Sequence, residues 1–366
     1  MRRPVSASLP AFPWDTLAEA AATAGAHPDG IVDLSVGTPV DPVAPMIQAA
    51  LAGAAGAPGY PFTAGTGELR AAAVAALSRR YAVTGLAEHA VLPVIGTKEL
   101  IAWLPSLIGL GAEDLVVIPE LAYPTYEVGA RLAGAQVVAA DSLTQLGPRS
   151  PALMYLNSPS NPTGRVLGVD HLRKVVEWAR ERGALVVSDE CYLGLGWEEQ
   201  PVSVLHPTVC GGDHRGLLAV HSLSKSSSMA GYRAGFVAGD AGVVAELLAV
   251  RKHAGMMVST PVQVAMVAAL EDDAHQAEQR GRYARRREVL LGAVRSAGFT
   301  VEHSEAGLYL WATRGEPCRD TVDWLAERGI LVAPGDFYGT SGARYVRMAL
   351  TATDERIAAA TARLSA

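Results

Sequence analysis

Short apolar runs alternate with helical stretches through the middle of this 366-residue chain, and the alternation limits its fold more than any other feature. Strands that are apolar throughout are buried on both faces, and helices between such strands cover both faces of a mostly parallel sheet. The last two runs are too close together for a helical crossover, so we expect the final strand to be antiparallel. The pattern predicts an α/β fold with seven strands, at Val91–Ile95, Leu115–Ile118, Gln136–Val138, Leu153–Leu156, Ala184–Ser188, Leu217–His221 and Ala234–Ala238.

The rest of the chain predicts a smaller α+β domain. After a helical and charged connector from Thr260 to Ser296, shorter strand and helix patterns continue to the C-terminus. Residues 1–13 are rich in proline and are expected to form an extended arm. We therefore expect three segments: an N-terminal arm with part of the small domain in residues 1–45, a large domain in 46–275 and a C-terminal small domain in 276–366.

Charge and composition narrow the range of functions. The formal net charge is −6, whereas binding to nucleic acid needs a basic face, so nucleic acid is not expected as a partner. The arginines between Arg280 and Arg287 are expected to face solvent from a long helix. The three cysteines suggest neither a disulfide framework nor a metal site, and no segment reaches the ~18 apolar residues of a membrane span. We expect a cytoplasmic protein that binds neither metal nor membrane.

A lysine lies just after the sixth predicted strand, among hydroxyl groups. The stretch reads Ser222-Leu-Ser-Lys225, and Arg233 follows it. A lysine that attacks an aldehyde must be neutral, and burial or a nearby cation lowers its pKa toward working pH. Ser222, Ser224 and Arg233 are donors of the kind that hold a phosphate dianion. A carbonyl-seeking lysine beside a phosphate cradle is the outline of a pyridoxal-phosphate site, although a solvated Ser/Lys loop would also explain the short motif.

Polar residues also follow the two preceding strands. Asp189 and Tyr192 come after the fifth strand, and Asn161 comes after the fourth, within Asn157-Ser-Pro-Ser-Asn161-Pro-Thr-Gly164. A carboxylate such as Asp189 can keep a pyridine nitrogen protonated, so that the ring draws electrons from a carbanion. Tyr192 and Asn161 can hydrogen-bond the ring oxygen. Asp189 could instead cap a helix, and a plain turn would explain the proline and glycine.

Further candidates lie at two other strand ends and in the C-terminal region. Thr97 and Lys98 begin a predicted helix after Gly96, where free N–H groups can bind a phosphate. Tyr123 follows the second strand and can lie flat on a cofactor ring, although a core position would also explain it. Arg347 lies in a strand of alternating apolar residues. A buried arginine needs a partner, which is either a substrate carboxylate or an internal salt bridge.

Together these blocks resemble the fold-type I, class I and II pyridoxal-phosphate aminotransferases. The resemblance covers nearly the whole chain, and the Asn-x-Pro-x-Asn-Pro-Thr-Gly, Asp-x-x-Tyr and Ser-x-Ser-Lys blocks come in the family's order. It implies a large domain with a mostly parallel, mixed seven-stranded sheet covered by helices, and a smaller α+β domain. It also implies pyridoxal 5′-phosphate as cofactor, and amino acids and 2-oxo acids as substrates.

The resemblance implies roles at the cofactor ring for five residues. Lys225 is the Schiff-base lysine that also shuttles protons, and Asp189 pairs with the pyridine nitrogen. Asn161 and Tyr192 contact the ring hydroxyl. Tyr123 stacks on the ring.

The resemblance also implies the groups that hold the phosphate and the substrate. Arg347 binds the substrate α-carboxylate, with Asn161 and the backbone at Gly37 beside it. Tyr60 reaches the phosphate of the neighbouring subunit, which implies a homodimer with active sites at its interface. The phosphate-binding groups of the chain's own site are the N–H groups of Thr97 and Lys98 together with Ser222, Ser224 and Arg233.

Within the family, Leu9-Pro-Ala-Phe-Pro-Trp-Asp-Thr-Leu17 and Gly96-Thr-Lys-Glu99 are similar to actinobacterial succinyldiaminopimelate aminotransferases of lysine biosynthesis. We therefore expect amino transfer from N-succinyl-LL-2,6-diaminopimelate to 2-oxoglutarate. The alternatives are another class I/II aminotransferase, acting on aspartate, aromatic or many amino acids, and a C–S β-lyase. A nicotinamide dehydrogenase is disfavoured, because Gly65-Thr-Gly67 lacks both a preceding strand and a third glycine.

Overall fold

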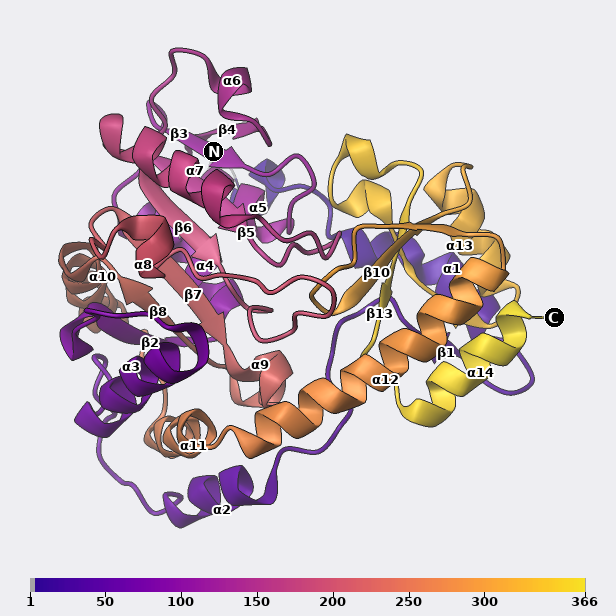
Figure 1. Cartoon of the computed structure of the whole chain (residues 1–366), viewed down its shortest axis with the longest axis horizontal. Coiled ribbons are helices and arrows are strands. Elements are labelled where there is room, and N and C mark those ends of the chain that lie inside the picture. The colour runs from indigo at the N-terminus through magenta and orange to yellow at the C-terminus, as the bar shows by residue number, and fades with distance from the viewer. Residues whose placement is uncertain (1–3, 366) are drawn as a thin grey trace.

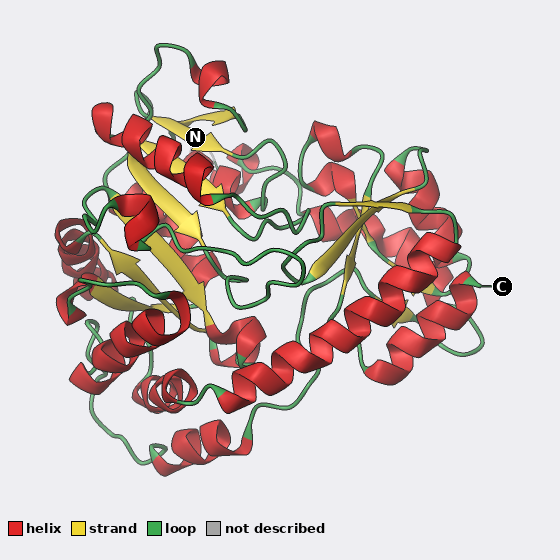
Figure 2. Ribbon diagram, viewed as in Figure 1, coloured by secondary structure: helices red, strands yellow, loops and turns green. Residues whose placement is uncertain are grey.

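The computed structural model describes residues 4–365 and has two sheet-bearing parts (Figure 1, Figure 2). A large sheet with its helices lies on the left of the view, and a smaller sheet lies on the right. Helix α12 (Ala274–Ser296) runs between the two parts. Residues 1–3 of the expected N-terminal arm lie outside the described residues. None of the helices within residues 4–365 is both long and apolar enough to cross a membrane.

Seven strands form the large sheet, as the apolar runs predict. They are β2 (Val91–Ile95), β3 (Leu115–Ile118), β4 (Gln136–Ala139), β5 (Leu153–Asn157), β6 (Leu185–Asp189), β7 (Leu217–Ser222) and β8 (Ala234–Gly239). Their order in the sheet is β2-β8-β7-β6-β5-β3-β4. Strands β3 to β7 pair in parallel, whereas β8 is antiparallel to both β7 and β2. The α/β fold, the seven strands and the antiparallel last strand are therefore confirmed.

Side chains of each central strand alternate between two buried faces. Along β7, Leu217 and Ala219 pack with one set of helices, whereas Leu218 and Val220 pack with the other. The first set comprises α3 (Gly67–Tyr81), α7 (Val169–Glu181) and α11 (Thr260–Glu271). The second comprises α4 (Thr97–Leu107), α5 (Thr125–Ala133) and α10 (Ala241–Ala254). Coverage on both faces explains why these strands are apolar throughout.

One edge of the sheet gathers the polar residues that follow the strands. Asn157 at the end of β5 lies opposite Asp189 at the end of β6. Ser222 at the end of β7 lies opposite Gly235 near the start of β8, and β2 ends at the same edge. Ligands of open α/β sheets bind outside the carboxyl ends of the strands. The remaining helices of this part are α2 (Pro45–Gly53), α6 (Leu143–Leu146), α8 (Pro207–Cys210) and α9 (Leu223–Ser226).

The smaller part combines both ends of the chain. Its four-stranded sheet has the order β12-β13-β10-β9, and β1 pairs in parallel with β11. The strands are β1 (Val32–Asp33), β9 (Thr300–Glu302), β10 (Tyr309–Thr313), β11 (Ile330–Leu331), β12 (Ala333–Pro334) and β13 (Val346–Ala349). Helices α1 (Ala18–Gly25), α13 (Cys318–Ala326) and α14 (Asp354–Leu364) share its core. The predicted boundary at residues 275–276 falls in the first turn of α12, and the division into domains stays a prediction.

The N-terminal segment is less extended than its proline content predicts. A 3₁₀ helix, η1, spans Val5–Ser8, and η2 spans Pro13–Leu17 and leads directly into α1. Pro13 occupies the start of η2, where the missing N–H has no intrahelical partner to lose. The other 3₁₀ helices are η3 (Glu88–Ala90), η4 (Ala230–Tyr232), η5 (Gly335–Phe337) and η6 (Thr340–Gly342).

The arginines of α12 do not form the solvent-facing row that the sequence predicts. Arg286 is buried and binds both oxygens of Asp41, at 2.6 and 2.8 Å, and one oxygen of Asp354, at 2.6 Å. Burial alone would raise the pKa of Asp41, but the hydrogen bonds and charge of Arg286 lower it. The prediction was wrong for Arg286 because its acceptors come from distant parts of the chain. Arg280 and Arg285, by contrast, are exposed as predicted.

Replacing Arg286 by Met should lower the free energy of unfolding by about 3 kcal/mol, because one partner of a buried ion pair is removed and Asp41 is left charged. Urea denaturation measures this change. The control is Arg285→Met on the same helix, which should change the stability by less than about 0.5 kcal/mol. Equal stabilities of the two variants would show that the Asp41–Arg286 pair does not hold α12 in place.

Candidate active site

A cavity of about 560 Å³ opens at the carboxyl edge of the large sheet and extends to the smaller part. Its lining includes the ends of β6 and β7 and the start of α4 from the large part, and Tyr309 and Arg347 from the small sheet. The cavity brings together all of the predicted site residues except Tyr60: Gly37, Thr97, Lys98, Tyr123, Asn161, Asp189, Tyr192, Ser222, Ser224, Lys225, Arg233 and Arg347.

Lys225 lies in the one-turn helix α9, not in the open loop that the sequence suggests. The side chain of Ser222 caps this turn by accepting a hydrogen bond from the N–H of Ser224 at 3.1 Å. The ammonium group of Lys225 donates to the carbonyl of Gly37. Burial, followed by the nearby charges of Arg347 and Arg233, lowers the pKa of Lys225 to about 8, against an opposing effect of Cys191. Lys225 can therefore be neutral at a pH near 8.

Helix α12 contacts the Lys225 turn at two points. The Tyr283 hydroxyl donates to the carbonyl of Lys225 at 3.2 Å. One nitrogen of the His275 ring lies 2.9 Å from the Ser227 hydroxyl, and the other lies 2.7 Å from the Asp272 carboxylate. Ser227 is buried, and none of Ser227, His275 and Tyr283 lines the cavity, so these contacts hold the turn without occupying the site.

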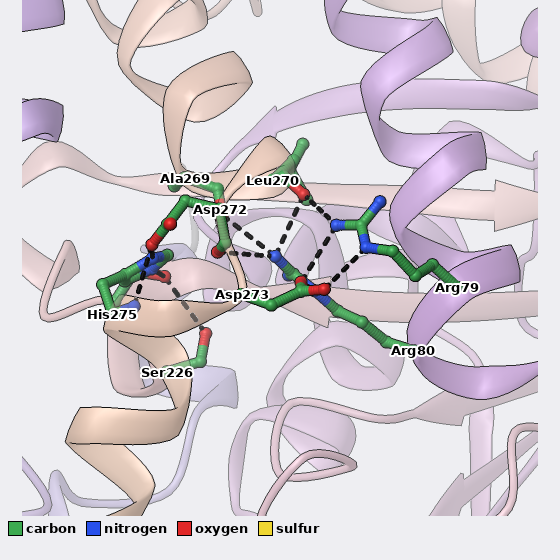
Figure 3. A network of polar contacts seen from close by, with 9 residues as sticks. Arg79, Arg80, Ser226, Ala269, Leu270, Asp272, Asp273 and His275 are labelled. Carbon is green, nitrogen blue, oxygen red and sulfur yellow. Dashed lines mark hydrogen bonds and ion pairs between the residues drawn. The ribbon is translucent and has the colours of Figure 1, made fainter.

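The junction between α11 and α12 is itself tied to α3 (Figure 3). Arg79 and Arg80 of α3 both bind the carboxylate of Asp273, with closest contacts of 2.6 Å. Arg80 also donates to the carbonyls of Ala269 and Leu270. Because the last carbonyls of a helix have no intrahelical partners, these bonds stabilise the end of α11. Figure 3 shows His275 beside this junction and close to Ser226, the last residue of α9.

Asp189 is a buried carboxylate at the end of β6. It accepts hydrogen bonds from the Tyr126 hydroxyl at 2.8 Å and from the N–H of Cys191 at 3.2 Å. Burial raises its pKa, against the lowering effect of Cys191 and Tyr126. No helix begins at this position, so the alternative of a helix cap does not hold. Tyr126 was missed by the sequence analysis, although it lies three residues after Tyr123 in the first turn of α5.

The opposite end of the cavity offers donors for an anion. Thr97 begins α4, directly after Gly96. Gly96 has φ +76°, and a side chain at position 96 would collide with the guanidinium of Arg233. Arg233 itself has φ +58° and stands immediately before β8. Glu99 in the first turn of α4 binds the buried Arg251 at 2.9 and 3.1 Å, which fixes the start of the helix. A helix N-terminus next to an arginine is a favourable phosphate site.

Arg347 is buried without an acidic partner. One terminal nitrogen donates to the side-chain oxygen of Asn161 at 2.8 Å, and the other donates to the carbonyl of Ser35 at 2.6 Å. The Nε atom is buried and has no hydrogen-bond partner within residues 4–365. These neutral partners leave the charge of Arg347 uncompensated, which argues against the alternative of an internal salt bridge.

Tyr60 lies apart from the cavity and its side chain is 97% exposed. Its predicted role therefore depends on a neighbouring subunit and stays a prediction. The cavity also contains residues that were not predicted to line the site, although Phe12 and Trp14 lie in the block at residues 9–17 quoted above: Phe12, Trp14, Val36, Thr38, Cys191, Ala230 and Tyr309.

These groups fit pyridoxal 5′-phosphate. The hydroxyls of Ser222 and Ser224, the start of α4 and Arg233 are suited to the phosphate. At the other end, the hydrogen-bond donors to Asp189 described above are uncharged. A protonated pyridine nitrogen would supply the positive charge that this buried carboxylate lacks. No group of three or more acidic, histidine or cysteine side chains suited to a metal occurs in the described part of the chain.

The fold and the cavity define a cofactor-binding α/β enzyme, and the comparison with known families agrees. Residues 29–364 match the family described as aminotransferase class I and II. The chain belongs to this family. Its members are pyridoxal-phosphate-dependent aminotransferases, so the expected cofactor and the broad reaction class are confirmed.

Individual relatives cover nearly the whole chain. A "probable aminotransferase" of Mycobacterium tuberculosis is 78% identical over 99% of this chain and 86% of its own length. The 4-dedimethylamino-4-oxo-anhydrotetracycline transaminase OxyQ of Streptomyces rimosus is 60% identical over 98% of this chain and 99% of its own. The solved structure of a "probable N-succinyldiaminopimelate aminotransferase" from Thermus thermophilus is 29% identical, with a TM-score of 0.86, and covers 96% of this chain and 99% of that one.

The pKa of Lys225 predicts how fast this lysine is acetylated at different pH. In the protein without cofactor, trace labelling by acetic anhydride should rise with a midpoint near pH 8, because only the free amine reacts. A lysine in a model peptide in the same solution should have its midpoint near 10.4. Quantifying the Lys225 peptide by mass spectrometry between pH 6 and 11 gives the midpoint. Coincidence with the model peptide would contradict the lowering of the Lys225 pKa by burial and by the charges of Arg347 and Arg233.

Proposed function

We propose that the protein transfers the amino group of N-succinyl-LL-2,6-diaminopimelate to 2-oxoglutarate, with Lys225 as the catalytic base. The observation that carries the proposal is a single cavity that holds a buried amine of lowered pKa, a buried carboxylate and an unpaired buried arginine. Membership in the aminotransferase family supports the reaction class. The similarity to the Thermus thermophilus protein supports the substrate.

Three residues of the cavity have different proposed roles in the reaction. Pyridoxal phosphate, when bound, supplies an aldehyde for the amino group and a ring that accepts electrons from the α-carbon. Lys225 is proposed to take the α-proton on its Nζ atom, and a pKa of about 8 suits this exchange. Arg347 binds the α-carboxylate and thereby orients the Cα–H bond. Asp189 is proposed to remain charged and to pair with the ring nitrogen.

The cavity wall favours a substrate whose distal end is negatively charged. The ammonium of Lys98 lies 5.7 Å from the ring centre of Phe12 and 6.0 Å from that of Tyr123. Burial and the charge of Arg233 lower the pKa of Lys98. If the backbone N–H of Lys98 serves the phosphate, its side chain is free to contact the substrate. A succinyl carboxylate is an acceptor of the right charge for this ammonium.

A second candidate substrate is a bulky ring compound. The 60% identity to the Streptomyces rimosus transaminase favours it, as do the aromatic side chains of Phe12 and Trp14 on the cavity wall. A panel of amino donors decides between the two. N-Succinyl-LL-2,6-diaminopimelate, aspartate, tyrosine and an anhydrotetracycline amine are each incubated with 2-oxoglutarate, and the glutamate formed is measured. Pyruvate release from cystathionine without an acceptor would instead indicate a C–S β-lyase.

We also propose that the protein acts in the cytoplasm as a homodimer. Tyr60 and Phe62 are exposed on one loop, as expected for residues that contact a second subunit. In the dimer, Tyr60 is proposed to reach the phosphate of the partner's cofactor. Light scattering coupled to size exclusion gives the mass in solution, and a monomer would contradict this part of the proposal.

The side chain of Lys98 can be tested separately from its backbone. Lys98→Met keeps the N–H group and the aliphatic chain but removes the charge. We expect the KM for N-succinyl-LL-2,6-diaminopimelate to rise about tenfold, as for the loss of a charged hydrogen bond. The affinity for pyridoxal phosphate, measured by absorbance titration, should change less than twofold.

The matched control is Lys252→Met on α10, since Lys252 is exposed and lies outside the cavity. It should leave both constants unchanged. A loss of cofactor affinity in Lys98→Met with an unchanged KM would place the ammonium on the phosphate and would contradict its role at the distal end of the substrate.

A further inference from the structure

Tyr309 lies beside Arg347, the proposed substrate-binding residue, although no sequence motif marks it. It is the first residue of β10 and lines the cavity. Its hydroxyl lies 3.0 Å from the hydroxyl of Tyr192. Its ring centre lies 4.0 Å from the guanidinium carbon of Arg347. A side chain at Gly37 would collide with the Tyr309 hydroxyl, so only glycine allows this approach. One tyrosine thus contacts three residues with proposed roles in the site.

The ring of Tyr309 covers a face of the Arg347 guanidinium that hydrogen bonds cannot use. Both terminal nitrogens of Arg347 already bind oxygens at the edge of the guanidinium plane, from Asn161 and Ser35. An aromatic face attracts a cation electrostatically, and the attraction is stronger where water is excluded. The ring therefore holds the plane of Arg347 in a fixed orientation. A bidentate grip on a carboxylate depends on that orientation.

The hydroxyl of Tyr309 acts on a different group. Tyr192 and Tyr309 cross edge to face, with ring centres 5.7 Å apart, and their hydroxyls meet. Burial raises the pKa of Tyr192 well above its ordinary value, and the neighbouring Tyr309 raises it further. Tyr309 thus restricts both the orientation and the ionisation of the Tyr192 hydroxyl.

We propose that Tyr309 is a positioning residue with two separable functions: its ring orients Arg347 toward the substrate carboxylate, and its hydroxyl orients Tyr192 toward the cofactor ring. The inference rests on the roles proposed above for Arg347 and Tyr192. The functions are separable because they use different atoms. Removing only the hydroxyl should affect the step that involves Tyr192, whereas removing the ring should also weaken substrate binding.

Two variants of the cofactor-loaded full chain test whether the ring and the hydroxyl of Tyr309 have separate functions. Tyr309→Phe keeps the ring, and Tyr309→Leu removes it. Each is mixed with L-glutamate, and a single turnover is followed by cofactor absorbance, which gives a limiting rate and an apparent dissociation constant. For Tyr309→Phe we expect the limiting rate to fall roughly fivefold to tenfold, as for one lost hydrogen bond, with the dissociation constant within twofold of wild type. For Tyr309→Leu we expect the dissociation constant to rise about tenfold in addition.

A second readout does not depend on turnover. The pH midpoint of the bound cofactor's visible absorbance should move to higher pH in both variants, because Tyr192 would no longer be held in the orientation in which it donates to the cofactor. The control is Tyr345→Phe, a tyrosine that stacks on Trp311 outside the cavity. It should match wild type in rate, dissociation constant and midpoint. Thermal unfolding of each loaded variant shows whether it folds.

The outcomes distinguish this inference from the proposed function. If wild type does not react with L-glutamate, glutamate is not the amino-group partner, and the pH midpoint still decides whether Tyr309 acts on Tyr192. If wild type reacts but both variants lose rate and affinity in parallel, the two functions are not separable and the inference is overturned. Wild-type constants and midpoint in Tyr309→Leu would overturn it as well.

Discussion

The structure depends on charged groups that are buried around one cavity and are not neutralised by one another. Lys225 donates to a backbone carbonyl, Asp189 accepts from a hydroxyl and an amide, and Arg347 donates to an amide oxygen and a carbonyl. Burying such groups costs free energy unless a ligand supplies the opposite charge. In the proposed function, a zwitterionic cofactor and an amino acid carboxylate would supply these charges. We therefore expect the site to be most stable when it is loaded.

The rest of the fold provides the rigidity that this arrangement needs. Parallel strands end side by side at the cavity, so Asp189 and Ser222 come from covered strands that have little freedom to move. Helix α12 spans the two sheet-bearing parts and contacts the Lys225 turn through Tyr283 and His275. Arg286 on the same helix binds Asp41, which follows the segment containing Gly37. One helix thus holds both the lysine and the backbone beside it.

Local sequence was sufficient to predict the strands of the large sheet and most of the residues that line the cavity. An apolar run followed by a polar residue predicts a strand end and a side chain at the sheet edge, and this rule placed Asp189, Asn161, Ser222 and Lys225 correctly at the cavity. The rule failed where the partner is distant in sequence. Tyr126 binds Asp189 across 63 positions, Tyr309 meets Tyr192 across 117, and Arg286 meets Asp41 across 245. No periodicity or motif contains such pairings, because they arise only when the two parts of the chain pack together.

All of the roles proposed for the cavity residues depend on Lys225 being the lysine that binds the cofactor. The direct measurement is to load the purified protein with pyridoxal phosphate, reduce it with borohydride and locate the attached cofactor by peptide mass spectrometry. The structure predicts one modified position, Lys225, at one cofactor per chain. Attachment at Lys98, which lines the same cavity, or at any other lysine would contradict the assignment of the carboxylate, the phosphate donors and the substrate arginine together.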